Sequence, residues 1–125
     1  MTNSLKKIII FDDDEDILSI CSYILEEKGW KVYTFTDCNK ITDKVSDIFP
    51  DVILMDNWIP DQGGIIATQT LKNVEKLKDI PVIYFSANSE IQSLANEAGA
   101  NSFLAKPFDL DELERIINEV LININ

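Results

Sequence analysis

The sequence predicts an α/β fold in which five strands alternate with five helices to give a doubly wound, five-stranded parallel sheet. Short apolar runs alternate five times along the chain with segments whose apolar residues recur at helical spacing. The third run, Val52 to Met55, has no polar interruption, which is typical of a strand covered by helices on both faces. Right-handed crossovers between such strand–helix units place helices on both sides of one sheet.

Size and composition predict one domain over residues 1–125. Of the 125 residues, 46% are hydrophobic, which is enough apolar material for a single core. The ten predicted elements use the whole sequence, so we expect no linker, repeat or effector domain within it.

In the first half of the chain, strands are predicted from Ile8 to Phe11 and from Lys31 to Phe35. The second strand alternates in polarity and suits a sheet edge. The helix between them is ended by Gly29, and its expected inner face is Ile17, Ile20, Cys21, Ile24 and Leu25. Asp37 is expected to cap a short helix that ends before Pro50. The apolar positions of this short helix are Ile41, Val45 and Ile48.

After the third strand, a Pro/Gly loop leads into a helix with a ragged apolar pattern, formed by Ile66, Leu71, Val74 and Leu77. A fourth strand runs from Val82 to Phe85 and stops at Ser86. Ser89 and Gln92 have the spacing of a capping box for the next helix. The apolar face of that helix is Ile91, Leu94, Ala95 and Ala98, with Gly99 past its end.

The last unit is a short strand from Ser102 to Ala105 followed by a helix. Lys106-Pro107 stops the strand, and Asp109 with Glu112 has capping-box spacing for the helix. The expected inner face of this helix is Leu110, Leu113, Ile116, Ile117, Val120 and Leu121.

Composition excludes several classes of function. A net charge of −11, from 22 acidic and 11 basic residues, repels nucleic-acid phosphates and anionic lipid, so we expect neither direct nucleic-acid binding nor membrane association. The absence of histidine excludes Ser-His-Asp triads and imidazole zinc sites. No signal peptide or apolar stretch of about 20 residues is visible. We therefore predict a cytoplasmic protein in which Cys21 and Cys38 are reduced thiols.

Polar residues stand where four of the predicted strands end. The first strand ends at Asp12 and Asp13, the third at Asp56, the fourth at Ser86 and the fifth at Lys106. Because the carboxyl ends of parallel strands share one edge of a sheet, these five residues are predicted to meet there.

This set of side chains favours phosphoryl transfer with Mg²⁺. Clustered carboxylates repel one another unless a cation sits among them, and carboxylates without imidazole or thiolate suit Mg²⁺. Asp56 can then act as a nucleophile on phosphorus, with Lys106 and Ser86 offering a charge and a hydroxyl to the phosphoryl oxygens. Simpler interpretations exist: Asp12 and Asp13 in an acidic first turn, Ser86 as a turn cap, and Lys106 as a surface lysine.

The chain resembles, over its whole length, the receiver domain of response regulators, the phosphoacceptor module of two-component signalling. Four segments carry the resemblance: residues 8–16, residues 50–56 followed by Pro60 and Gly64, Ser86-Ala87, and Lys106-Pro107-Phe108. The resemblance implies a flavodoxin-like fold with strand order 2-1-3-4-5. It also implies a signalling switch with self-catalysed phosphoryl transfer and autodephosphorylation, rather than an enzyme.

The resemblance implies a role for each site residue. Asp56 would be the phosphoacceptor and Asp13 a direct Mg²⁺ ligand, with Asp12 acting through water and the backbone carbonyl of Trp58 supplying another ligand. Ser86 would bond the phosphoryl group and Lys106 would pair with it. Phe103 falls at the aromatic switch position, although plain core packing would also explain it.

Partners are also implied by the resemblance. A histidine kinase or phosphotransfer protein would donate the phosphoryl group, and the last two helices with the strand between them would face an output partner. The chain ends at Asn125, just past the final helix, so we expect either a stand-alone receiver or an excised one.

Three positions depart from the commonest family residues, and two other functions compete. The departures are Trp58, Gln62-Gly63-Gly64, and Phe103, which lacks the hydroxyl of a tyrosine. A haloacid-dehalogenase-type phosphatase also uses an aspartyl phosphate, but it needs an aspartate two residues after the nucleophile, where this chain has Trp58. A degenerate receiver used for protein interaction alone would not need the complete set of site residues.

Overall fold

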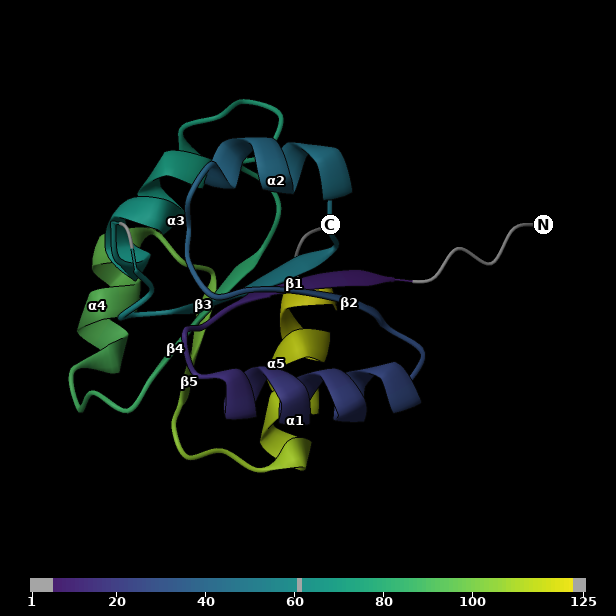
Figure 1. The fold of residues 1–125 in the computed structure, drawn as a ribbon. Helices are drawn as coiled ribbons and strands as arrows, with labels where there is room; N and C mark the ends of the chain where they lie inside the picture. The colour runs from purple at the N-terminus through teal and green to yellow at the C-terminus, as the bar shows by residue number, and fades with distance from the viewer. Residues whose placement is uncertain (1–5, 61, 123–125) are drawn as a thin grey trace.

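The computed structural model, which describes residues 6–60 and 62–122, contains one parallel sheet between two layers of helices (Figure 1). The strand order is β2-β1-β3-β4-β5, and all four neighbouring pairs are parallel. The doubly wound fold and its strand order are therefore confirmed, and the alternating second strand lies at an edge as predicted. The ends of the predicted 1–125 domain lie outside the described residues.

The ten elements follow the predicted order. The strands are β1 (Lys7–Phe11), β2 (Lys31–Phe35), β3 (Val52–Asp56), β4 (Val82–Ser86) and β5 (Ser102–Ala105). The helices are α1 (Glu15–Glu27), α2 (Ile41–Ile48), α3 (Gly64–Lys72), α4 (Ile91–Ala98) and α5 (Leu110–Ile122). No helix in the described part of the chain is long and apolar enough to cross a bilayer.

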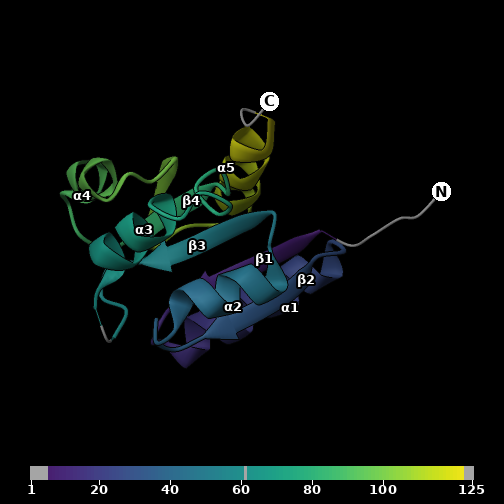
Figure 2. The same cartoon turned by 90° about the horizontal axis from the view of Figure 1, so that it is seen from above.

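The sheet separates two apolar cores. Helices α2, α3 and α4 cover one face, and α1 and α5 cover the other. Seen from above, α2 lies in front of the strands and α1 behind them (Figure 2). Successive strand residues point to opposite faces, so in β1 Ile9 packs on the α2–α3–α4 side and Ile10 on the α1–α5 side. This double covering explains why β3 and β4 are buried along their whole length.

Both cysteines are free and buried, in agreement with the predicted thiols. Burial raises the pKa of Cys21 to about 11, and the Asp12 carboxylate adds to that rise. Cys38 donates its thiol hydrogen to the carbonyl oxygen of Pro60 at 3.1 Å, which links the β2–α2 loop to the loop after β3.

The inner face predicted for the first helix is wrong at Ile20, which is 57% exposed. The buried stripe of α1 instead consists of Leu18, Cys21 and Leu25. These three residues follow the 3.6-residue helical period, and Ile20 falls outside their stripe.

The predicted Asp37 cap is also wrong. The Asp37 Oδ1 atom accepts a hydrogen bond from the Asn39 N–H at 2.9 Å, so this carboxylate closes a turn before the helix instead. Helix α2 begins at Ile41 after Lys40, whose φ of 53° is left-handed, and no side chain caps it.

The predicted third helix is too long, because α3 ends at Lys72 and Val74 and Leu77 lie in the turns that follow. Leu77 is nevertheless buried, so the apolar pattern read as one helix includes residues that pack on the core without being helical. The Lys72 ammonium donates to the carbonyl oxygens of Lys78 and Ile80, at 3.1 and 2.9 Å, and holds these turns in place. Ile66, also assigned to the apolar pattern, is 51% exposed.

The two predicted capping boxes have opposite outcomes. At α5, Asp109 Oδ1 accepts from the Glu112 N–H at 2.8 Å and Glu112 Oε1 accepts from the Asp109 N–H at 3.4 Å, so this box is confirmed. At α4 the N-cap is Glu90 and no side chain caps the helix, so the Ser89–Gln92 box is wrong. The Asn88 side chain instead accepts a hydrogen bond from the Glu90 N–H at 2.7 Å, which closes a turn just before the helix.

This contrast gives a paired test of stability. Asp109→Ala removes a reciprocal cap and is expected to lower the free energy of unfolding by about 1 kcal/mol. Ser89→Ala removes no cap and is expected to change it by less than about 0.5 kcal/mol. Urea unfolding of both variants measures the difference, and equal losses would contradict the assignment of the caps.

Candidate functional site

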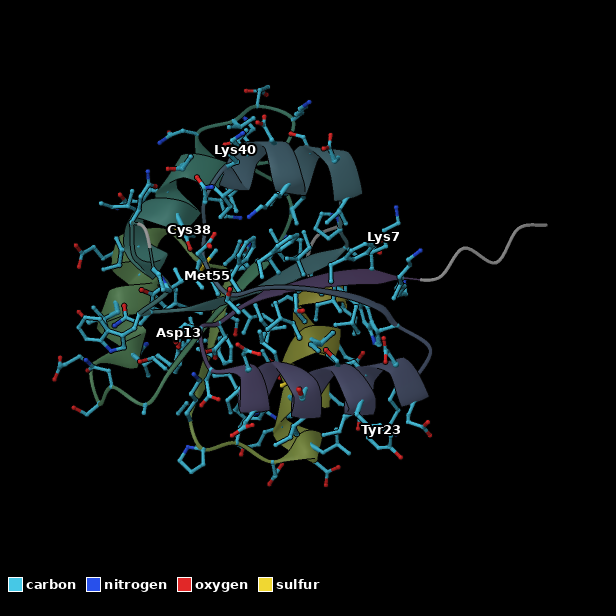
Figure 3. All side chains as sticks on the ribbon, in the orientation of Figure 1. Lys7, Asp13, Tyr23, Cys38, Lys40 and Met55 are labelled. Atoms are coloured by element: carbon cyan, nitrogen blue, oxygen red, sulfur yellow. The ribbon has the colours of Figure 1, made fainter. Side chains whose placement is uncertain are left out.

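The five polar residues predicted at the strand ends line one cleft at the carboxyl edge of the sheet. The cleft has a volume of about 430 Å³. Its lining residues are Asp12, Asp13, Asp14, Asp56, Trp58, Ser86, Ala87, Asn88 and Lys106. In Figure 3, Lys7 lies at the start of β1 and Asp13 lies two residues past its other end.

Strand alternation brings three of these residues to the same side of the sheet. Ile10, Leu54 and Leu104 all pack toward α1 and α5. Asp12, Asp56 and Lys106 each come two residues after one of them and therefore point to the same side. Ser86 comes two residues after Tyr84 and points to the other side of the sheet, where Tyr84 packs. The cleft therefore receives side chains from both faces where the sheet ends.

Lys106 bridges the two buried carboxylates. Its Nζ atom lies 2.8 Å from Asp12 Oδ2 and 2.9 Å from Asp56 Oδ1, and it sits 4.5 Å from the centroid of the Phe85 ring. Asp12 is 1% exposed and Asp56 is 4% exposed. A charge buried to this extent requires a partner, and one ammonium serves both carboxylates.

Backbone donors hold the other oxygen of each buried carboxylate. Asp12 Oδ1 accepts from the Asp14 N–H at 2.9 Å, and Asp56 Oδ2 accepts from the Trp58 N–H at 3.1 Å. The carboxylate of Asp14 is used elsewhere, because it caps α1 through the N–H groups of Asp16 and Ile17. The predicted acidic first turn of that helix is thus confirmed for Glu15 and Asp16.

The electrostatics of the cleft favour an added positive charge. Burial raises the pKa of Asp56 above its usual range, and the Asp12 carboxylate raises it further, against hydrogen bonds from Lys106 and the Trp58 N–H. Burial lowers the pKa of Lys106, but its hydrogen bonds to Asp12 and Asp56 outweigh this, so its pKa lies above the usual value. Lys106 therefore stays charged while Asp56 remains costly to ionise.

The carboxylates fit a divalent metal ion. Asp12, Asp13 and Asp56 each offer an oxygen atom, and these oxygens all lie within 4.8 Å of one another. Asp13 is exposed, while the other two are buried. Three carboxylates and one ammonium leave two negative charges uncompensated, and an all-oxygen donor set is the kind that Mg²⁺ prefers.

Ser86 and Phe103 occupy different surroundings. Ser86 is 2% exposed, lines the cleft and accepts from the Asn88 N–H at 3.0 Å, so its own hydrogen is left to donate. Phe103 pairs with Tyr84 in the sheet register and is half-buried against the α2–α3–α4 core, outside the lining of the cleft. Trp58 lines the cleft with a side chain that is 73% exposed.

Sequence reasoning missed Tyr84 and Asn57. The Tyr84 hydroxyl donates to Asn57 Oδ1, next to the predicted acceptor. Burial raises the pKa of Tyr84 to about 12, with further contributions from Asp56 and Glu97, so the hydroxyl keeps its proton. A tyrosine inside the otherwise apolar run 82–85 was the available signal, because a buried hydroxyl needs a partner.

Comparison with known proteins agrees with this geometry. Residues 8–118 match the family described as response regulator receiver domain. This chain belongs to that family. As a receiver domain, it is a signalling module of two-component systems.

Two curated relatives and one solved structure illustrate the family. The receiver domain is 33% identical over 111 residues to the DNA-binding dual master transcriptional regulator RpaA of Synechocystis, covering 87% of this chain and 46% of that protein. It is 31% identical over 111 residues to the CAI-1 autoinducer sensor kinase/phosphatase CqsS of Vibrio cholerae, covering 86% of this chain and 16% of that protein. The chain thus spans less than half the length of either relative.

The solved structure is the receiver domain of a sensor histidine kinase from Pseudomonas aeruginosa, with a magnesium ion coordinated in its active site cleft. It superposes with a TM-score of 0.88 at 26% identity and covers 96% of this chain and 100% of that one. In the present chain, Asp12, Asp13 and Asp56 form an acidic cluster at the cleft on the carboxyl edge of the sheet.

Gly64 is required where the loop after β3 meets the core. A Cβ atom at this position would overlap the Asp56 carbonyl oxygen and lie 2.9 Å from the Tyr84 hydroxyl oxygen. Gly64→Ala is expected to lower the free energy of unfolding in urea by roughly 1–3 kcal/mol. Gly29→Ala is the control, because it has open space around it and costs about 1 kcal/mol through its left-handed backbone alone. A loss in Gly64→Ala no larger than that in Gly29→Ala would contradict the close contact.

Asp56→Asn is expected to stabilise the metal-free receiver at neutral pH. A carboxyl whose pKa is raised by folding binds protons better in the folded chain, so its ionisation removes stability as the pH rises through that range. The gain from asparagine should therefore shrink in acid, where Asp56 is already neutral. Urea unfolding with a chelator at both pH values measures this, with the exposed Asp111→Asn as control. Equal or lower stability of Asp56→Asn at neutral pH would contradict the raised pKa.

Proposed function

We propose that this receiver domain takes a phosphoryl group from a histidine kinase or phosphotransfer protein onto Asp56 in a reaction that depends on Mg²⁺. The observation that carries the proposal is the placement of Asp56. Its carboxylate ends a central strand, lines the cleft, and has the Lys106 ammonium 2.9 Å from one oxygen. Nucleophile and counter-charge are thus side by side before any substrate arrives.

The covalent step exchanges one bond for another. An Asp56 oxygen attacks phosphorus, the new O–P bond forms, and the P–N bond to the donor imidazole breaks with its electron pair leaving on nitrogen. Lys106 stays within reach of the oxygens that gain charge. Ser86 donates its hydroxyl hydrogen to a phosphoryl oxygen, because its Oγ only accepts in the hydrogen bond from the Asn88 N–H.

The residues that would hold Mg²⁺ are Asp12, Asp13 and Asp56, together with the backbone carbonyl of Trp58. When bound, the ion supplies positive charge to the phosphoryl oxygens. Asp13 is suited to direct ligation because it is the exposed member of the group. Asp12, whose Oδ2 atom already binds Lys106, is suited to acting through water.

Phosphorylation is proposed to alter the surface formed by α4, β5 and α5. A phosphoryl group on Asp56 adds negative charge beside Ser86, whose Oγ accepts from the loop that leads into α4. Phe103 on β5 is half-buried and can repack when that loop moves. An output partner would read the result. Loss of the phosphoryl group to water would then return the switch to its initial state.

The competing functions receive less support. A phosphatase of the haloacid-dehalogenase type needs an acid two residues after the nucleophile, and Trp58 cannot donate a proton there. A degenerate receiver used for protein interaction alone would not require five polar residues to line one cleft. The net charge of −11 disfavours direct binding of nucleic acid or of an anionic membrane by this chain.

Peptide mass spectrometry tests the proposal. The protein is incubated with acetyl phosphate, with Mg²⁺ or with a chelator, and the modified residue is mapped. One phosphoryl group is expected on Asp56 with Mg²⁺, and none with the chelator or in Asp56→Asn. Asp51→Asn is the matched control, since this exposed acid lies just before the same strand and binds the Lys7 N–H at 2.8 Å. Modification of another residue with Asp56 untouched would contradict the proposal.

A further inference from the structure

Tyr84 carries a buried hydroxyl that the proposed phosphoryl transfer does not use. The residue is fully buried on β4, in register with Met55, and its neighbours in the strand are apolar. Phenylalanine would fill nearly the same volume, so packing alone does not require the hydroxyl. Its hydrogen-bond partner is Asn57 Oδ1, in the residue directly after the proposed phosphoacceptor.

Asn57 is held by three hydrogen bonds. Its N–H donates to the Phe85 carbonyl oxygen at 3.3 Å, and its own carbonyl oxygen accepts from the Gly64 N–H at 3.0 Å. The Tyr84 hydroxyl fixes its side chain. The start of the acceptor loop is therefore tied to β4 and to the beginning of α3.

These bonds orient the two peptide groups that follow Asp56. The planar group between Asn57 and Trp58 is held at its carbonyl by Gly64, and its N–H donates to Asp56 Oδ2 at 3.1 Å. The group between Asp56 and Asn57 is held through the Asn57 N–H. The missing side chain of Gly64 lets the Tyr84 hydroxyl and the Asp56 carbonyl approach from one side.

We infer that Tyr84 is a positioning residue, whose hydroxyl holds Asn57 so that the Asp56 carboxylate and the Trp58 backbone are set for the metal and the phosphoryl group. This inference rests on the proposed function of the cleft. Tyr84 does not line the cleft and acts through Asn57 alone. Removing a direct hydrogen-bond partner of a metal ligand typically weakens metal binding about 10–100-fold. Tyr84 lies one residue further out, so we expect a loss at the lower end of that range.

Tyr84→Phe tests the inference, with Tyr33→Phe as the matched control. Tyr33 packs against the same core but lies on the edge strand β2. Calorimetry should show that the Mg²⁺ dissociation constant of Tyr84→Phe rises roughly 10-fold, while that of Tyr33→Phe is unchanged. Amide hydrogen exchange at Trp58 and Gly64, measured in the metal-free protein, should accelerate in Tyr84→Phe but not in the control.

Asn57→Ala removes the same hydrogen bond from its other side and serves if Tyr84→Phe folds poorly. Combining Tyr84→Phe with Asn57→Ala should weaken Mg²⁺ binding no more than Asn57→Ala alone. Unchanged affinity and exchange in Tyr84→Phe, or an equal loss in Tyr33→Phe, would overturn the inference. If the wild-type protein binds no Mg²⁺, the proposed function fails, and the exchange rates still decide whether Tyr84 orders the loop.

Discussion

The crowding of three carboxylates, two of them bridged by one ammonium group, is the constraint on which this site depends. Asp12, Asp13 and Asp56 place oxygens within 4.8 Å of one another, and Lys106 compensates one of their charges. Such an arrangement destabilises the isolated fold, since buried like charges repel and lose hydration. The uncompensated negative charge of the cluster can attract a divalent cation and, with it, a phosphoryl group.

The surrounding fold keeps that crowding in place. Parallel strands bring residues from three distant parts of the chain to one edge, and alternation along each strand turns Asp12, Asp56 and Lys106 toward the same side. Backbone N–H groups then fix the remaining carboxylate oxygens. Hydrogen bonds from Cys38, Gly64 and Tyr84 hold the loop after Asp56, so the mutually repelling carboxylates are kept in place.

Much of the fold follows from local sequence, and the errors have a common cause. Uninterrupted apolar runs such as Val52 to Met55 can be satisfied only between two helical layers, which fixes the sheet. Helix caps were harder to predict, because the side chains of Asp37 and Asn88 close turns that precede a helix and do not cap the helix itself. Spacing alone cannot tell these uses apart, since both satisfy a nearby backbone N–H. Ile20 and Val74 show that apolar residues also occur outside a helix's inner face.

The site was predictable where it depends on topology and hidden where it depends on tertiary contacts. Strand ends revealed Asp12, Asp56, Ser86 and Lys106, whereas the Tyr84–Asn57 pair required the relative placement of two strands and a loop.

The most direct test of the central claim is calorimetric titration of the wild-type protein with Mg²⁺. The account predicts saturable binding of one ion per chain that Asp13→Asn and Asp56→Asn each weaken strongly. Absence of binding, or binding that survives both substitutions, would contradict it.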